Sequence, residues 1–126
     1  MLYKPQKDFP LLERYKEVFP INDRTIIAYD KVIYCNEKLP PHLEIHERRH
    51  LIRQQKQGLD EWVEKYLTDT KFRLNEEVIA YKEQCLSIPD RNVRERLRIM
   101  CAKDLSSSLY GNLVTFDEAL KLLQSK

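Results

Sequence analysis

Apolar and polar residues recur along most of this chain with the period of an α-helix. In these stretches the apolar positions lie three or four residues apart, which places them on one face of a helix. Six segments have this pattern and are predicted helices: residues 9–18, 41–57, 60–67, 71–86, 91–110 and a last one that begins at Thr115 or Asp117. Helix therefore dominates the predicted structure.

One segment has a different pattern and predicts β structure. Residues 25–34 are rich in β-branched and aromatic side chains around an Asp30–Lys31 corner, which is typical of a hairpin or two short strands. The predicted fold class is α+β, mainly α, with this small β element before the helix at 41–57. The two glycines, Gly58 and Gly111, each follow a predicted helix, where a left-handed C-terminal cap is expected.

Length and charge limit the classes of function. A chain of 126 residues is expected to form one domain, residues 1–126, with a core of its own. The 22 basic and 20 acidic residues give a net charge of only +2, so neither nucleic acid nor an anionic membrane is an expected partner. No apolar run reaches the length of a membrane span, and the N-terminal residues lack the apolar run of a signal peptide. The oligomeric state is not predicted.

The cysteines indicate a reducing compartment. Cys35, Cys85 and Cys101 are odd in number, widely spaced and form no Cys-x-x-Cys pair. They are therefore expected to be reduced, half-buried packing residues of a cytoplasmic protein, and no cysteine metal site is predicted.

The segment His46-Glu47-Arg48-Arg49-His50 spells the zinc-hydrolase signature HExxH. Four residues of α-helix turn through about 400°, so both imidazoles project from one face, about 6 Å apart along the axis. Two neutral histidines in this arrangement can bind one zinc ion. Glu47, roughly 100° around the helix, can then accept a proton from a water that the metal activates.

A catalytic zinc site needs a third protein ligand. His42 is a poor candidate, because three ligands strung along about 12 Å of one straight helix cannot converge on a tetrahedral ion; it is expected to be a first-turn surface histidine. The adjacent Glu76 and Glu77, in an otherwise apolar helical stretch, are better placed. Their periodicity alone does not choose between them.

Across residues 25–84 the chain resembles the gluzincin metallopeptidases, and its length resembles the small minigluzincins and small HExxH proteins of bacteriophages. The matching residues are His46, Glu47 and His50, followed by Glu77 with Ala80 three residues later. The resemblance implies a zincin-like helical domain with one Zn2+ per chain, and it favours Glu77 over Glu76 as third ligand.

The resemblance also implies a function. It indicates hydrolysis of a protein or peptide substrate with Glu47 as general base, and a strand at residues 31–34 that pairs with extended substrate. Larger gluzincins add a histidine, tyrosine or arginine that stabilises the reacting oxygen. Here Tyr81, Tyr110 or an arginine would have to serve.

Two alternatives to an enzyme stay open. The first is a zinc-containing interaction module with little or no catalytic activity, since oxyanion donors are scarce and a small chain leaves little room for a cleft. The second is a helical scaffold without metal, in which the HExxH segment is a chance match.

Overall fold

A computed structural model describes residues 2–125, and its architecture is α+β, mainly α, as the sequence predicts. The α-helices in this part of the chain are α1 (Leu12–Lys16), α2 (Pro41–Gln57), α3 (Leu59–Thr68), α4 (Thr70–Leu86), α5 (Arg91–Leu105) and α6 (Phe116–Gln124). The strands are β1 (Leu2–Lys4), β2 (Ile27–Tyr29) and β3 (Val32–Tyr34), and two short 3₁₀ helices are η1 (Gln6–Asp8) and η2 (Ser108–Tyr110).

The predicted hairpin is confirmed. β2 and β3 pair antiparallel with Tyr29 opposite Val32, so that Asp30 and Lys31 form a two-residue turn. Both turn residues have positive φ, 47° for Asp30 and 69° for Lys31, as a type I′ hairpin requires. This turn matches the right-handed twist of the two strands that it joins.

The third strand, β1, is absent from the sequence prediction. It pairs parallel with β3, which gives the sheet order β1-β3-β2 and leaves β3 paired on both sides. β1 is short and its three side chains are exposed, so it carries no alternation of apolar and polar residues. Its pairing depends on contact with a strand nearly 30 residues away along the chain, which a local pattern does not report.

Two predicted helices are shorter than expected. The first was predicted over residues 9–18, but Phe9 has extended backbone (φ −66°, ψ 119°), because a residue before proline is disfavoured in the helical region. The helix predicted over residues 91–110 ends at Leu105. There Ser107 Oγ donates to Asp104 O and accepts from Leu109 N, and such local bonds compete with the helical ones.

The helix ends agree in part with the prediction. Gly111 has the expected left-handed conformation (φ 92°, ψ 24°). Gly58 has positive φ but extended ψ (104°, 125°), because it ends α2 and precedes α3 directly. Of the two candidate starts for the last helix, Thr115 caps it: its side chain accepts from Glu118 N, while the Glu118 side chain accepts from Thr115 N.

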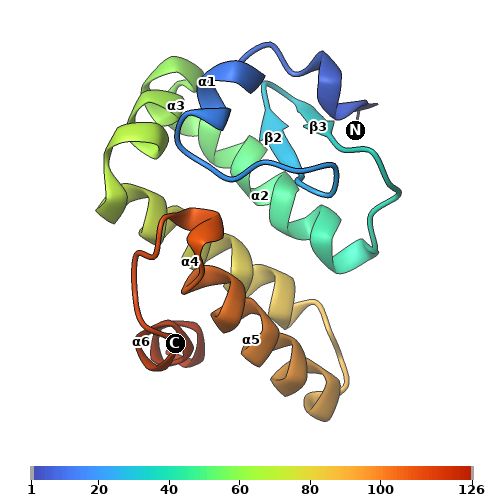
Figure 1. Cartoon of the computed structure of the whole chain (residues 1–126). Coiled ribbons are helices and arrows are strands. Elements are labelled where there is room, and N and C mark those ends of the chain that lie inside the picture. Colours follow the sequence, from blue (N-terminus) through green and yellow to red (C-terminus); the bar gives the residue numbers. More distant parts are fainter. Residues whose placement is uncertain (1, 126) are drawn as a thin grey trace.

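The two larger apolar clusters lie on opposite sides of the α2–α4 pair. The hairpin and the N-terminal segment lie on one side of α2, whereas α5 and α6 pack on α4 at the other side (Figure 1). The first cluster joins Phe9, Tyr15 and Tyr34 to Trp62 of α3, and the second joins α4, α5 and α6. Together, α2 and α4 bury a set of polar and charged side chains: His46, Glu47, His50, Gln54, Arg73, Glu76, Glu77 and Gln84.

The three cysteines are free thiols, and two of them, Cys85 and Cys101, lie in the α4–α5–α6 cluster. Within residues 2–125, no helix is long and apolar enough to cross a membrane.

Candidate metal centre

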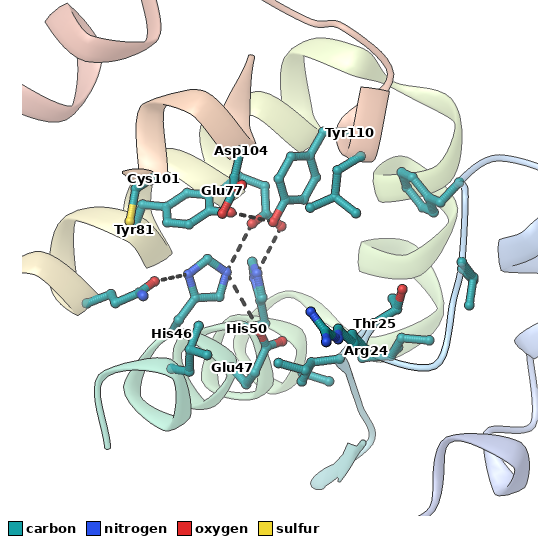
Figure 2. A pocket seen from close by; sticks show the side chains of 18 of the residues that line it. Arg24, Thr25, His46, Glu47, His50, Glu77, Tyr81, Cys101, Asp104 and Tyr110 are labelled. Carbon is teal, nitrogen blue, oxygen red and sulfur yellow. Dashed lines mark hydrogen bonds and ion pairs between the residues drawn. The ribbon is translucent and has the colours of Figure 1, made fainter. Parts of the chain in front are cut away.

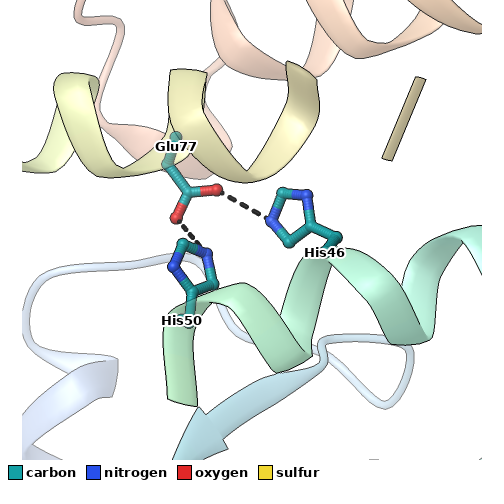
Figure 3. Close-up of side chains that lie close together, drawn as sticks. All are labelled: His46, His50 and Glu77. Carbon is teal, nitrogen blue, oxygen red and sulfur yellow. Dashed lines mark hydrogen bonds and ion pairs between the residues drawn. The ribbon is translucent and has the colours of Figure 1, made fainter. Parts of the chain in front are cut away.

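Two histidines of α2 and one glutamate of α4 meet in the buried polar layer (Figure 3). His46 and His50 lie one turn apart, with exposed fractions of 3 % and 5 %. Their Nε2 atoms lie 3.1 Å and 2.9 Å from the two carboxylate oxygens of Glu77. The ligand atoms of the three residues all lie within 4.8 Å of one another, so this group could hold a metal ion.

Glu77, rather than its neighbour Glu76, faces the histidines. Glu76 is also completely buried, but its Oε1 accepts hydrogen bonds of 2.7 Å from Trp62 Nε1 and from Arg53 Nε. One residue is about 100° of rotation on a helix, which points the two carboxylates toward different neighbours. Glu76 therefore ties α4 to α2 and α3 and is kept away from the candidate metal centre.

The hydrogen bonds of His46 fit a metal ligand. Its Nδ1 lies 2.9 Å from Gln84 Oε1 and acts as the donor, because an amide oxygen only accepts. In the neutral ring, Nε2 then carries a lone pair, which faces Glu77 Oε1 at 3.1 Å. A nitrogen and a carboxylate oxygen this close attract each other when a proton or a metal ion lies between them. Metal-binding histidines typically donate their second ring nitrogen to such an oxygen.

The surroundings of Glu77 favour its ionised form. Burial by itself would raise its pKa, but His50 and then His46, whose Nε2 atoms face the two carboxylate oxygens, outweigh burial and lower the pKa. Tyr66 adds a third partner, since its hydroxyl donates to Glu77 Oε2 at 2.6 Å. Burial and the charge of Glu77 raise the pKa of Tyr66, so this phenol stays a donor. The ionised carboxylate is the form that binds metals.

Glu47 lies beside the three candidate ligands without joining them. Its Oε2 is 3.9 Å from His46 Nε2, and its side chain is buried against the same cavity. Burial raises its pKa to about 7, with a further contribution from the charge of Glu77 and an opposing one from His46. A carboxyl group with such a pKa can accept a proton and release it again near neutral pH.

A cavity of about 420 Å³ opens onto this cluster. It lies between the segment that precedes β2 on one side and α5 with η2 on the other (Figure 2). Much of its wall is apolar and includes Phe19, Ile21, Ile26, Leu97, Met100 and Leu109. Arg24 and Asp104 add charges of opposite sign from the two sides. The cavity is therefore mainly apolar, and the polar cluster forms part of its wall.

Both tyrosines that the sequence singled out line this cavity. Their hydroxyls are hydrogen-bonded to each other at 2.7 Å, and the ring of Tyr81 packs edge-on against His46 with centroids 4.4 Å apart. Burial and the charge of Glu77 raise the pKa of both Tyr81 and Tyr110. Both phenols therefore stay protonated and can donate hydrogen bonds near the cluster.

His42 lies in the first turn of α2, as predicted, but it is less exposed than expected, and the sequence prediction did not include Gln84. His42 was expected on the surface, but the side chain is half-buried, lines the cavity and accepts from Gln84 Nε2 through Nδ1 at 2.8 Å. The reason is that Gln84 of α4 reaches the first turn of α2. The sequence contained a signal for Gln84, because it follows Glu77 by seven residues, which is two helical turns along the same face.

The prediction that residues 31–34 would pair with substrate is wrong. These residues contain β3, whose two sides are already paired with β1 and β2. The strand that faces the cavity is β2, through Ile27 and Ala28.

Comparison with known proteins gives no match: no protein-family model, no curated protein and no solved structure compared with this chain matches it. The geometry of the site is therefore the basis for assigning a function. The deciding features are the three candidate ligands, the neighbouring carboxyl group of Glu47 and the cavity that reaches them.

Proposed function

We propose that this chain is a zinc-dependent peptide hydrolase in which His46, His50 and Glu77 hold one zinc ion. The observation that carries the proposal is the convergence of two imidazoles and one carboxylate, all buried, at a cavity that also contains Glu47. Two nitrogen ligands and one oxygen ligand suit zinc, whereas magnesium and calcium prefer all-oxygen sites. Three protein ligands are also the usual number in catalytic zinc sites, which keep one position open.

When bound, zinc would supply Lewis acidity, which lowers the pKa of a coordinated water to about 7 and polarises a carbonyl group. Glu47 takes the proton of the attacking water as the new C–O bond forms, and then gives it to the amine nitrogen as the C–N bond breaks. His46 and Glu77 would not perform this transfer, because His46 Nε2 and the Glu77 carboxylate would hold the metal.

Extended substrate would bind along β2. Residues 26–28 line the cavity, and β2 is an edge strand of the sheet. Gln54 already bonds to part of this edge, since its amide donates to Ala28 O and accepts from Asp30 N. A peptide in the cavity would therefore pair with the residues before Ala28.

Tyr110 and Tyr81 are the candidate donors to the carbonyl oxygen as it gains negative charge. We expect Tyr110→Phe to lower kcat by about 10²-fold with little change in KM, which is the lower end of the effect of removing one oxyanion donor. Steady-state kinetics with a peptide substrate measure this. Tyr81→Phe is the matched variant, and unchanged kcat in both would exclude the pair from the chemistry.

One observation favours a second candidate function. The two tyrosine hydroxyls bond to each other, so the oxyanion donors are engaged before any substrate binds. A zinc-holding interaction module with little or no turnover would need no free donor.

Zinc content and peptide cleavage together test the proposed function. Elemental analysis of the purified chain should give about one zinc per chain, and the zinc-loaded chain should cleave an unfolded protein or a mixed peptide library. A chelator should stop cleavage and added zinc should restore it. Bound zinc without cleavage would instead support the interaction module, and failure to bind zinc even when it is supplied would reject both.

A further inference from the structure

A short chain of hydrogen bonds connects the candidate ligand His46 to the cavity wall at His42. The link is Gln84, whose side chain is 2 % exposed. Its Oε1 lies 2.9 Å from His46 Nδ1 and its Nε2 lies 2.8 Å from His42 Nδ1. An amide has one end that accepts and one that donates, so its orientation decides which ring nitrogen of each histidine carries a proton.

The two possible orientations of this amide have opposite consequences for the site. With Oε1 toward His46, as in the structure, His46 donates from Nδ1 and the Nε2 lone pair of the neutral ring is free for a metal. With the amide turned over, its N–H would point at Nδ1 and the proton would move to Nε2. Nε2 would then donate to Glu77, and the same three residues would form a hydrogen-bonded cluster that cannot bind a metal through His46.

We propose that Gln84 is a positioning residue of the metal site, and that His42 holds its amide in the metal-binding orientation by accepting from Nε2. The proposal rests on the metal site of the proposed function, but it does not require turnover. Outer partners of metal-binding histidines typically change metal affinity by 10–100-fold when they are replaced.

Gln54 provides a matched control on the neighbouring helix. It is also a buried glutamine, 1 % exposed, and both ends of its amide are hydrogen-bonded. Its partners are Ala28 O and Asp30 N of the hairpin, at 2.8 Å and 3.1 Å. Replacing it removes a comparable set of buried hydrogen bonds without changing a bond to His46.

The test is the zinc dissociation constant, measured by competition with a chelator, together with thermal unfolding of each metal-free variant. Gln84→Met should weaken zinc binding by about 10–100-fold. Gln84→Glu should bind zinc at least as tightly as the wild type, because a carboxylate only accepts and so keeps the proton on His46 Nδ1. Gln54→Met should lower the unfolding temperature and leave the dissociation constant unchanged, and His42→Phe should cause a smaller loss of affinity than Gln84→Met.

The outcomes separate this proposal from the proposed function. Wild-type affinity in Gln84→Met, or equally weak binding in Gln84→Glu and Gln84→Met, overturns the role of Gln84, even if peptides are cleaved. Wild-type affinity in His42→Phe overturns the role of His42.

The expected order of zinc affinities without any peptide cleavage supports the proposal for Gln84 while the hydrolase function fails. If Gln84→Met does not fold, the zinc affinities of Gln84→Glu and His42→Phe still test the roles of Gln84 and His42. A wild-type chain that binds no zinc overturns both.

Discussion

Glu77→Gln is expected to weaken zinc binding by more than about 100-fold, which exceeds the usual effect of an outer partner. The amide keeps the size of the side chain but removes the negative charge between His46 and His50. It also replaces one carboxylate oxygen by an N–H₂ group. The two oxygens of Glu77 now face the histidine nitrogens and the Tyr66 hydroxyl. Elemental analysis of protein purified without added zinc, followed by chelator competition, measures the change.

Glu76→Gln is the matched control, because the two glutamates are adjacent and equally buried. This variant should keep the zinc of the wild type. It loses the ion pair with Arg53, so its free energy of unfolding should fall by about 1–3 kcal/mol, which chemical denaturation measures. Zinc lost from Glu76→Gln but retained in Glu77→Gln would reverse the assignment of the third ligand.

Glu47→Gln is expected to lower kcat by about 10²–10⁴-fold, the usual contribution of a general acid–base group, while about one zinc per chain remains bound. An amide cannot take a proton from water at neutral pH, yet it fits the volume of the buried carboxyl group. Zinc is retained because Glu47 lies outside the group of His46, His50 and Glu77 whose ligand atoms converge.

Peptide cleavage and zinc content must be measured on the same preparation of this variant. Retained zinc shows that the fold and the ligands are intact, so that a fall in kcat results from the loss of proton transfer by Glu47. Cleavage at the wild-type rate would remove Glu47 from the mechanism, and loss of zinc would make it a part of the metal site instead.

The spacing of residues along one helix was enough to predict two of the three candidate ligands. His46 and His50 are four residues apart, and this spacing alone places both imidazoles on one face of α2. The hairpin followed from residue types that suit strands on either side of a turn, Asp30–Lys31. The sequence also limited the third ligand to two adjacent glutamates.

Contacts between elements decided the rest. The packing of α2 on α4 turns Glu77 toward the histidines and Glu76 toward Trp62 and Arg53. The same packing brings Gln84 between His42 and His46, although the sequence indicated a surface position for His42.

The sheet shows the same division between local and tertiary information. β2 and β3 were predictable because a two-residue turn joins them, whereas β1 reaches β3 only through the fold and makes it the central strand. Periodicity along a helix or strand determines the direction in which each side chain projects from that element. Which of these faces meet, and so which charged groups share a site, is determined only when the elements pack together.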